Sequence, residues 1–393
     1  MKKLAIITTH PIQYNAPIFA LLTARGKVQV KVFYTWGESV LDNKYDPGFD
    51  KNISWDIPLL NGYEYSFIKN ISADPGSHHF KGINNQTLIN DIEKWKADTI
   101  LVYGWAFKSH LKAMRYFHGR IPVFFRGDST TLGKKQNLKF VARKYFLRWV
   151  YRHVDKAFYV GTYNKRYYLQ NGLKEHQLIF APHAVDNERF ADERGIFQMQ
   201  ANEWRKKLGI NPNDLVLVYA GKLEPIKNLG WLIETIRQLN ELPVKILLVG
   251  NGPLEKELKE MASGDSRFIF IDFQNQQQMP VVYRLGSVFI LCSHSETWGL
   301  SINEAMASGR AILASETFGC ISDLVKNSVN GYVFSLMNPE DLIHKIRILA
   351  GDGALAKRMG AESLKIIYDW NFEKVCKAIE NEIISDKIKK FNN

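Results

Sequence analysis

The sequence predicts an α/β protein with two doubly wound parallel-sheet domains. Short apolar runs alternate with helix-like segments along the whole chain, which is the pattern of βα units. A length of 393 residues is enough for two domains with full-sized cores. We expect a first domain over residues 1–185, a second over 186–370, and a terminal helix over 371–393 that crosses back to the first domain.

The first half carries six buried-strand candidates. A helix is expected over 18–22, because Asn15 and Pro17 precede it as start signals. The stretch 38–80 is punctuated by Gly, Asn and Pro, and we expect long loops there on the ligand side. The predicted strands are 4–7, 28–34, 99–103, 121–125, 156–160 and 178–180.

Charge is divided unevenly between the two halves. Residues 1–185 hold 27 Lys+Arg and 13 Asp+Glu, a balance of +14, whereas the remainder holds 25 and 27, a balance of −2. Between Lys108 and Arg166, 15 basic residues face only Asp128 and Asp155. Such a field favours an anionic partner: a membrane surface, a phospholipid-linked acceptor or a nucleic acid. We expect no nucleic acid partner, because no reading motif accompanies the charge.

One segment is the best membrane candidate. Residues 134–159 interleave basic and aromatic side chains, as in helices that lie in the headgroup region. The alternative is a helix that packs its aromatic residues on the sheet. No membrane-spanning run is present, and three unpaired cysteines suit a reduced compartment. We therefore expect a cytoplasmic protein, peripheral on the inner face of the cell membrane.

The chain is organised around residues 293–309. An apolar strand candidate, 288–292, leads into a loop with Glu296 and Gly299, and a short helix with Glu304 follows. Open α/β sheets bind ligands at the carboxyl ends of their strands. Carboxylates there accept hydrogen bonds from hydroxyls, while the helix N–H groups near Leu300 and Ser301 favour an anion. A nucleotide sugar has both features; the alternative is a surface helix with two solvated acids.

This stretch resembles the Glu-x7-Glu signature of the retaining glycosyltransferases of family 4, which have the GT-B fold of two Rossmann-like domains facing across a cleft. The resemblance implies that Glu304 contacts the nucleotide ribose and Glu296 the donor sugar. Residues 180–190 also resemble that family's inter-domain junction. The resemblance is specific over residues 180–375 and weak before them.

Two lysines in a second loop resemble the family's diphosphate-binding cations. Gly221, Lys222 and Lys227 follow a buried strand at 215–220. A lysine is a suitable point charge at a phosphate, although two loop lysines alone would be ordinary surface charge. Their position, about seventy residues before the paired glutamates, favours the functional interpretation.

Further donor-binding candidates follow the next strands. Gly250, Asn251 and Gly252 match the family's turn near the nucleotide, and Phe273 ends the strand candidate that carries Asp272, where relatives often have glycine. Acceptor-binding candidates lie in the first half: His10, Gln13 and Tyr14 after the first strand, and Arg126 and Asp128 where relatives often have a histidine. A structural role for the His10 turn is the alternative.

Together with these residues, the family resemblance implies a metal-independent, retaining glycosyltransferase without a cofactor. It would move a sugar from a nucleotide-diphosphate sugar to a glycan or lipid-linked acceptor, in bacterial surface polysaccharide or lipopolysaccharide biosynthesis. Lys222, Lys227 and Glu296 are the expected catalytic residues, with the lysines doing the electrostatic work of a metal. Adjacent His78 and His79 could bind a metal, but exposed loop histidines are common. The alternatives are a GT-B sugar-nucleotide epimerase and a non-catalytic sugar-nucleotide-binding scaffold partner.

Overall fold

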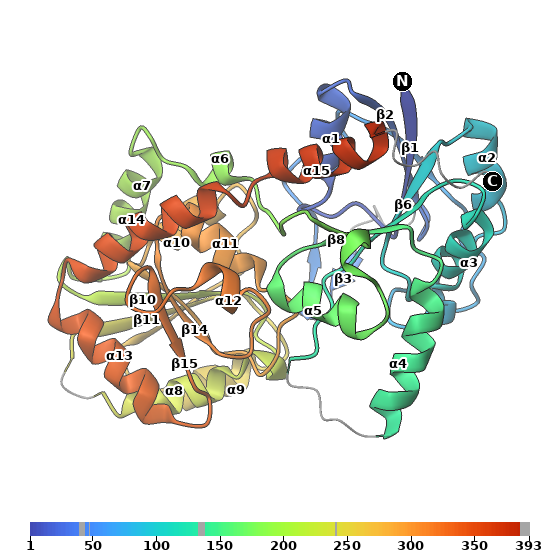
Figure 1. The fold of residues 1–393 in the computed structure, drawn as a ribbon. Helices are drawn as coiled ribbons and strands as arrows, with labels where there is room; N and C mark the ends of the chain where they lie inside the picture. Colours follow the sequence, from blue (N-terminus) through green and yellow to red (C-terminus); the bar gives the residue numbers. More distant parts are fainter. Residues whose placement is uncertain (39–43, 47, 133–137, 240–241, 386–393) are drawn as a thin grey trace. The chain divides into compact units, whose positions relative to one another are not determined.

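The computed structural model describes every residue except 39–43, 47, 133–137, 240–241 and 386–393 (Figure 1). Its elements form two compact units. The first contains residues 1–44, 58–184 and 372–393, and the second contains residues 45–57 and 185–371. The chain therefore enters the second unit twice: once for the short segment 45–57, and again after Ala184.

The first unit is built on a parallel seven-stranded sheet in the order β5-β2-β1-β6-β7-β8-β9. Its strands are β1 (Lys2–Thr8), β2 (Val28–Tyr34), β5 (Glu64–Phe67), β6 (Thr99–Tyr103), β7 (Val123–Arg126), β8 (Lys156–Tyr159) and β9 (Leu178–Phe180). In β1, the side chains from Leu4 to Ile7 are completely buried, because helices cover both faces of the sheet.

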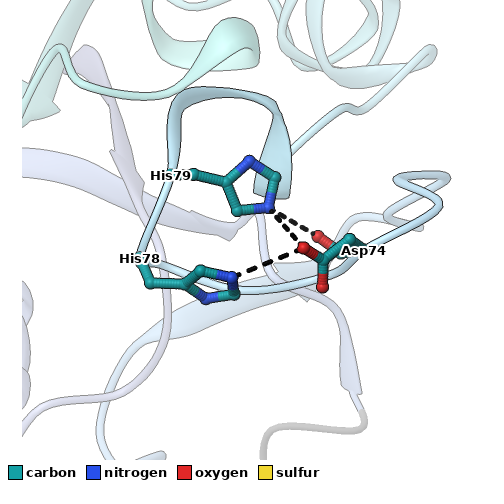
Figure 2. A group of neighbouring side chains, drawn as sticks. All are labelled: Asp74, His78 and His79. Atoms are coloured by element: carbon teal, nitrogen blue, oxygen red, sulfur yellow. Dashed lines mark hydrogen bonds and ion pairs between the residues drawn. The ribbon is translucent and has the colours of Figure 1, made fainter.

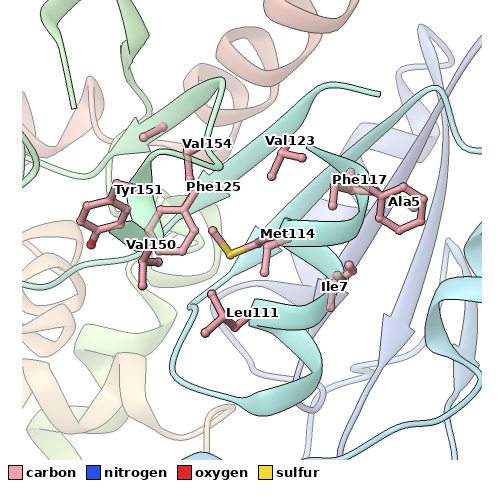
Figure 3. Close-up of a cluster of buried hydrophobic side chains, with 14 of the residues drawn as sticks. Ala5, Ile7, Leu111, Met114, Phe117, Val123, Phe125, Val150, Tyr151 and Val154 are labelled. Atoms are coloured by element: carbon pink, nitrogen blue, oxygen red, sulfur yellow. The ribbon is translucent and has the colours of Figure 1, made fainter. Parts of the chain in front are cut away.

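Two hydrophobic clusters fill the faces of this first sheet. One cluster joins Ala5 and Ile7 of β1 to Met114 of α3 and Val150 of α4 (Figure 3). The other packs α1 and the C-terminal helix α15 against the opposite face. The helices of this unit are α1 (Ala16–Ala24), α2 (Leu88–Trp95), α3 (Lys108–Phe117), α4 (Leu138–Tyr151), α5 (Thr162–Gln170) and α15 (Phe372–Ile384), with short 3₁₀ turns at Phe80–Gly82 and Glu175–Gln177.

The predicted return of the C-terminal helix to the first domain is confirmed. Helix α15 packs beside α1, where Arg25 donates to both carboxylate oxygens of Glu380 at 2.7 and 2.9 Å. The Glu380 side chain is only 1% exposed. Because removing one partner from a buried ion pair leaves an uncompensated charge, Arg25 and Glu380 fix the position of the helix.

The second unit contains a parallel six-stranded sheet in the order β12-β11-β10-β13-β14-β15. Helices α8, α9 and α13 lie on one side of it, and α10, α11 and α14 on the other (Figure 1). The strands are β10 (Leu215–Ala220), β11 (Val244–Val249), β12 (Phe268–Ile271), β13 (Val288–Leu291), β14 (Ala311–Ser315) and β15 (Gly331–Phe334). Two Rossmann-like parallel-sheet units are the predicted fold class, which is confirmed.

The helices of the second unit connect these strands in βα succession. They are α6 (Asn187–Phe190), α7 (Ile196–Lys207), α8 (Leu229–Arg237), α9 (Glu255–Met261), α10 (Met279–Arg284), α11 (Leu300–Ala307), α12 (Ile321–Leu324), α13 (Pro339–Gly351) and α14 (Leu355–Tyr368), with a 3₁₀ turn at Pro225–Lys227. Within the part of the chain that the structure describes, no helix is both long enough and apolar enough to cross a membrane.

The stretch 38–80, where we expected long loops, has loops at 54–63 and 68–79 and also three short strands. In this stretch β5 pairs in parallel with β2 at the edge of the first sheet. Two further strands, β3 (Lys44–Asp46) and β4 (Lys51–Ile53), form a small sheet of their own. These strands are three or four residues long, too short for an alternating apolar pattern to distinguish them from loops.

The membrane-candidate segment separates into an inner and an outer surface. Leu147, Val150 and Tyr151 of α4 are buried in the core, as the sheet-packing interpretation expects. Val141, Tyr145 and Phe146 are 48%, 66% and 42% exposed on the same helix. Lys134 and Lys135 of this segment lie outside the described residues. Helix α4 therefore keeps an exposed apolar and aromatic surface after it has packed on the sheet.

Candidate functional site

The predicted lysines and glutamates of the donor site follow β10 and β13, the two neighbouring strands at which the strand order of the second sheet reverses. From β10 the chain runs to β11 and β12 on one side, and β13, β14 and β15 lie on the other side of β10. Lys222 and Lys227 follow β10, while Glu296 and Glu304 follow β13. β10 and β13 are parallel neighbours whose following connections lead to opposite sides of the sheet, which leaves a crevice at their carboxyl ends, where open α/β sheets bind ligands.

The loop after β10 is tied to the loop after β13. The backbone N–H of His294 donates to the Ile226 carbonyl at 2.8 Å, and the Cys292 thiol donates to the Lys227 carbonyl at 3.2 Å. Burial raises the pKa of the Cys292 thiol to about 12, so the thiol keeps its proton and remains a donor. These bonds hold the lysine loop against the loop that carries Glu296.

Lys227 and Glu296 are in direct contact. The Lys227 ammonium forms a short ion pair with the Glu296 carboxylate, and Ser293 Oγ donates to the same carboxylate oxygen at 3.2 Å. Their side chains are 19% and 23% exposed, so both remain within reach of a ligand. The structure thus brings together one predicted cation and one predicted acid.

Glu304 is more deeply placed than Glu296. Its side chain is 3% exposed, and the Tyr283 hydroxyl donates to Oε2 at 2.6 Å. The Arg189 guanidinium lies 3.9 Å from Oε1. Neither Tyr283 nor Arg189 belongs to the motif, so no sequence pattern associates them with Glu304. Together they hold the Glu304 carboxylate in one orientation on α11.

Gly299 allows α11 to begin beside the acidic loop. It has a φ of +100°, and an added Cβ would lie 2.8 Å from Cδ1 of Phe318. Only glycine fits both the conformation and the space. Leu300 and Ser301 form the first turn of the helix, whose N–H groups have no carbonyl four residues earlier within the helix. This turn is therefore able to donate to an anion.

Gly250 and Gly252 allow the loops after β10 and β11 to pack backbone against backbone. A Cβ on Gly250 would lie 2.0 Å from the Gly221 carbonyl oxygen, and one on Gly252 would lie 2.6 Å from the Leu223 oxygen. Between these glycines, Asn251 accepts the N–H of Phe273 at 2.8 Å and donates to Asp272 at 3.0 Å. Asn251 is therefore a positioning residue for Phe273.

Segment 45–57, here called the 45–57 hairpin, reaches the same loops and was missed by the sequence analysis. Asp46 accepts from Lys222 Nζ at 2.9 and 3.1 Å. The rings of Phe49 and Trp55 lie 4.9 and 6.4 Å from the ring of Phe273. No local pattern marks these residues, because their partners are more than 170 positions away. Both predicted lysines are therefore already ion-paired within the chain, Lys222 with Asp46 and Lys227 with Glu296.

The predicted acceptor-binding residues lie after β1 and β7 in the first unit. His10 Nδ1 lies 2.8 Å from Thr9 Oγ1, and the His10 ring contacts Trp36 edge to face. Gln13 and Tyr14 are half-buried in the same loop. The loop therefore presents polar side chains near the carboxyl end of the first sheet.

Arg126 has a structural position rather than an open one. It is 3% exposed and donates to the carbonyls of Ala181 and Pro182, each at 2.9 Å. Asp128 remains about half exposed, with His183 Nε2 4.0 Å away. Of these two acceptor candidates, Asp128 is the one placed to meet a ligand, while Arg126 ties β7 to the end of β9.

One known family matches most of the second half of the chain. The family described as glycosyl transferases group 1 matches residues 200–365. The sulfoquinovosyl transferase SQD2 of Arabidopsis thaliana is 29% identical over 191 residues, covering 47% of this chain and 36% of that protein. The chain matches between about a third and a half of the length of its curated relatives.

Solved structures match over nearly the whole chain at low sequence identity. Anabaena Alr3699/HepE in complex with UDP and glucose superposes with a TM-score of 0.70 at 16% identity, covering 98% of this chain and 99% of that one. WaaG, a glycosyltransferase involved in lipopolysaccharide biosynthesis, gives 0.68 at 14% identity, covering 97% and 100%. Residues 200–365 thus match the glycosyl transferases group 1 model, and the whole chain has the two-domain GT-B fold of these solved structures.

Proposed function

We propose that this protein is a retaining glycosyltransferase of family 4. It would transfer a sugar from a nucleotide-diphosphate donor to a glycan or lipid-linked acceptor, in bacterial surface polysaccharide or lipopolysaccharide biosynthesis. The observation that carries the proposal is the contact of Lys227 with Glu296 at the switch point of the second sheet, with Lys222 in the same loop. A cation for phosphate and an acid for hydroxyls meet there.

The chemistry needs stabilisation of the leaving group. The bond from the anomeric carbon to the diphosphate oxygen breaks, a bond to the acceptor oxygen forms on the same face, and the acceptor proton goes to the departing diphosphate. Lys222, Lys227 and the first-turn N–H groups of α11 would stabilise the negative charge that develops there. A preorganised donor of this kind is worth on the order of 2.7–4 kcal/mol of barrier. The lysines supply this charge in the proposal without a metal ion.

The two glutamates would recognise hydroxyl groups. Glu304, held by Tyr283 and Arg189, would accept from the nucleotide ribose, and Glu296 would accept from the donor sugar. Gly221, Gly250, Asn251, Gly252 and Phe273 would line the nucleotide site. In the first unit His10, Gln13, Tyr14 and Asp128 would contact the acceptor. The Anabaena structure with UDP and glucose supports a nucleotide-sugar donor.

Membrane association is proposed from helix α4. Val141, Tyr145 and Phe146 are exposed beside the exposed Arg143 and Arg148. Aromatic and apolar side chains bordered by arginines suit the headgroup region of an anionic membrane. We place the protein at the inner face of the cell membrane. Flotation with anionic liposomes at low and high salt tests this. We expect the wild type to bind the liposomes, and the double variant Tyr145→Ser, Phe146→Ser to bind more weakly. Absence of wild-type binding at both salt concentrations would reject the membrane proposal.

The donor site is tested by ligand stabilisation and turnover. A panel of nucleoside diphosphates and nucleotide sugars should raise the melting temperature, since a ligand at 100 times its Kd stabilises by about 2.7 kcal/mol. Lys222→Ala should abolish transfer while leaving the fold intact. The control Lys256→Ala, at an exposed lysine of α9, should keep the wild-type rate of transfer. An undiminished rate in Lys222→Ala would remove that lysine from the mechanism.

Two results would redirect the proposal. Turnover of a nucleotide sugar without any acceptor would favour a sugar-nucleotide epimerase. Stabilisation by nucleotide sugars without turnover, even with acceptor-containing membranes, would favour a non-catalytic binding partner of another transferase.

A further inference from the structure

The 45–57 hairpin is fastened to the second unit at both ends. Beyond β4, Asn275 Nδ2 donates to the Ser54 carbonyl at 2.6 Å, and Gln277 Nε2 donates to the Asp56 carbonyl at 2.6 Å. The Asp56 carboxylate also accepts the Gln277 N–H at 3.2 Å. In the middle, Phe49 and Trp55 contact Phe273. The hairpin therefore has a defined seat on the donor-site loops.

At the other end, Asp46 engages Lys222 as a phosphate would. Both carboxylate oxygens lie within 3.1 Å of Nζ, and the ammonium also lies 5.0 Å from the centre of the Phe49 ring. Gly48 makes this approach possible, because an added Cβ would lie 2.6 Å from the Lys222 side chain. The turn is fixed by Gly48 N–H, which donates to Asp46 Oδ1 at 2.8 Å.

The negative charge of Asp46 makes its carboxylate a competitor of the donor diphosphate for Lys222. A diphosphate bound at Lys222 would lie within a few ångströms of the Asp46 carboxylate, and like charges at that separation repel. Burial raises the Asp46 pKa, but the hydrogen bonds from Lys222 and Gly48 N–H outweigh it and leave the pKa below its usual value. The carboxylate is therefore ionised at neutral pH.

We propose that Asp46 is a selectivity residue of the donor site, which a diphosphate must displace from Lys222. This inference rests on the proposed function and deepens it. Only a ligand with enough negative charge and an adjacent binding surface exchanges with the carboxylate, so a diphosphate is accepted in preference to a nucleoside or a monophosphate. Without a donor, the pair keeps Lys222 neutralised.

Isothermal titration with inorganic pyrophosphate and with UDP tests the exchange. Asp46→Asn keeps the side-chain shape and removes the charge, and we expect it to bind both ligands several-fold more tightly than the wild type. It should also reduce the preference for UDP over UMP. Asp50→Asn is the matched control, because it makes the same charge change at an exposed position of the same hairpin. That variant should bind as the wild type does.

The outcomes separate this inference from the donor-site proposal. If Lys222→Gln abolishes binding and Asp46→Asn leaves it unchanged or weaker, the donor site stands and the role of Asp46 is overturned. If Lys222→Gln binds pyrophosphate and UDP as tightly as the wild type, the donor site itself is wrong and Asp46 loses its role with it. If Asp46→Asn and Asp50→Asn increase the affinity for pyrophosphate and UDP equally, the effect comes from the net charge of the hairpin, and the selectivity role of Asp46 is overturned.

A second, independent observation concerns Asp74, His78 and His79 in the first unit. Both histidines direct Nε2 toward the carboxylate of Asp74, as Figure 2 shows. The distances from Asp74 Oδ2 are 3.5 Å to His78 and 3.2 Å to His79. Ligands about 2.0–2.1 Å from a tetrahedral zinc ion lie about 3.3 Å apart, so these two separations fit one ion.

The loop that carries the three residues is closely held. Asn70 accepts the N–H groups of Ser72 and Asn84 at 3.1 and 2.9 Å, and Ser72 Oγ donates to the Lys81 carbonyl at 2.8 Å. Gly76 leaves room for His78, because an added Cβ would lie 2.4 Å from its Nδ1. The loop that carries the three side chains is thus held in place by its own hydrogen bonds.

We infer that Asp74, His78 and His79 bind one divalent cation of the zinc, cobalt or nickel kind, through two imidazoles and a carboxylate with a position left open. Zinc titration of chelator-treated protein should show one bound equivalent in the wild type and in the control His176→Ala, an exposed histidine. Asp74→Asn, His78→Ala and His79→Ala should each weaken binding at least about tenfold.

The histidine tautomers give a readout that a purely structural cluster would not change. His79 Nε2 donates to the Asp74 carbonyl at 3.0 Å and so carries the proton, whereas a metal bound at Nε2 leaves the proton on Nδ1. NMR of the ring nitrogens should therefore show the His79 ring changing tautomer when zinc is added. Absence of zinc binding in the wild type, or equal binding in all three variants, would overturn the site.

Discussion

The Lys227 ammonium is paired with the Glu296 carboxylate across 69 positions of sequence. The contact depends on two backbone-directed bonds, from Cys292 and His294, that join the loops carrying the two residues. A cation for phosphate and an acid for hydroxyls are thereby held at one point before any ligand arrives, which is the preorganisation that electrostatic catalysis requires.

Removing the Lys227 charge should damage turnover more than folding. We expect Lys227→Ala to lower kcat by about 10²- to 10³-fold, since one preorganised donor to the leaving group is lost. Steady-state kinetics with the best nucleotide sugar of the panel measures this, with Lys256→Ala as the control. A change confined to KM would assign Lys227 to ground-state binding alone.

Glycine at position 250 is required by backbone packing. Gly250→Ala would place a Cβ 2.0 Å from the Gly221 carbonyl oxygen, so the lysine loop must shift. We expect a loss of about 1–3 kcal/mol in the free energy of unfolding and a weaker response to UDP. Gly351→Ala is the matched control, because an added Cβ there meets nothing within 4 Å. Equal stability of the two variants in denaturant titrations would contradict this account.

Arg126 should prove to be a stabilising residue of the first unit. Arg126→Gln loses charged hydrogen bonds to the buried carbonyls of Ala181 and Pro182, and we expect a loss of about 3 kcal/mol in unfolding free energy. Urea denaturation followed by a first-unit tryptophan signal measures it. If Arg126→Gln has wild-type stability and a raised KM for the acceptor, Arg126 would instead be an acceptor-binding residue.

Buried His110 should make the first unit less stable in acid. Burial lowers its pKa to about 4, and its two ring nitrogens lie 2.8 Å from Thr35 Oγ1 and the Gly104 carbonyl. In the unfolded chain its pKa is about 6.5, so the unfolded state binds the extra proton between these values. Stability should therefore fall by about 3 kcal/mol as the pH decreases from 6.5 to 4.

The slope of that pH dependence identifies the group responsible. His110→Gln should reduce the fall in unfolding free energy per pH unit by about 1.4 kcal/mol within this window, whatever its effect at neutral pH. His176→Ala, at an exposed position, should leave the slope unchanged. A parallel pH dependence in His110→Gln would assign the acid sensitivity to other groups.

Much of the fold follows from local patterns in the sequence. The strands at 28–34, 99–103, 178–180 and 215–220 agree with the predicted ranges, because buried parallel strands are apolar on both faces. The edge strand β5 was not predicted. Only two of its four residues are half-buried and the others are exposed, so it lacks the apolar run that marks a buried strand.

The sequence by itself determined the two-unit α/β fold and the order of the donor-site motifs, since strand runs, helix starts and glycine turns are constrained by their nearest neighbours. Only the tertiary structure decided that Asp46 pairs with Lys222 and that Tyr283 and Arg189 contact Glu304. It also decided that Arg126 is buried and donates to backbone carbonyls. These contacts join residues tens to hundreds of positions apart. Such pairs leave no periodic or spacing signal, because which side chains meet is set by how the strands are ordered in each sheet.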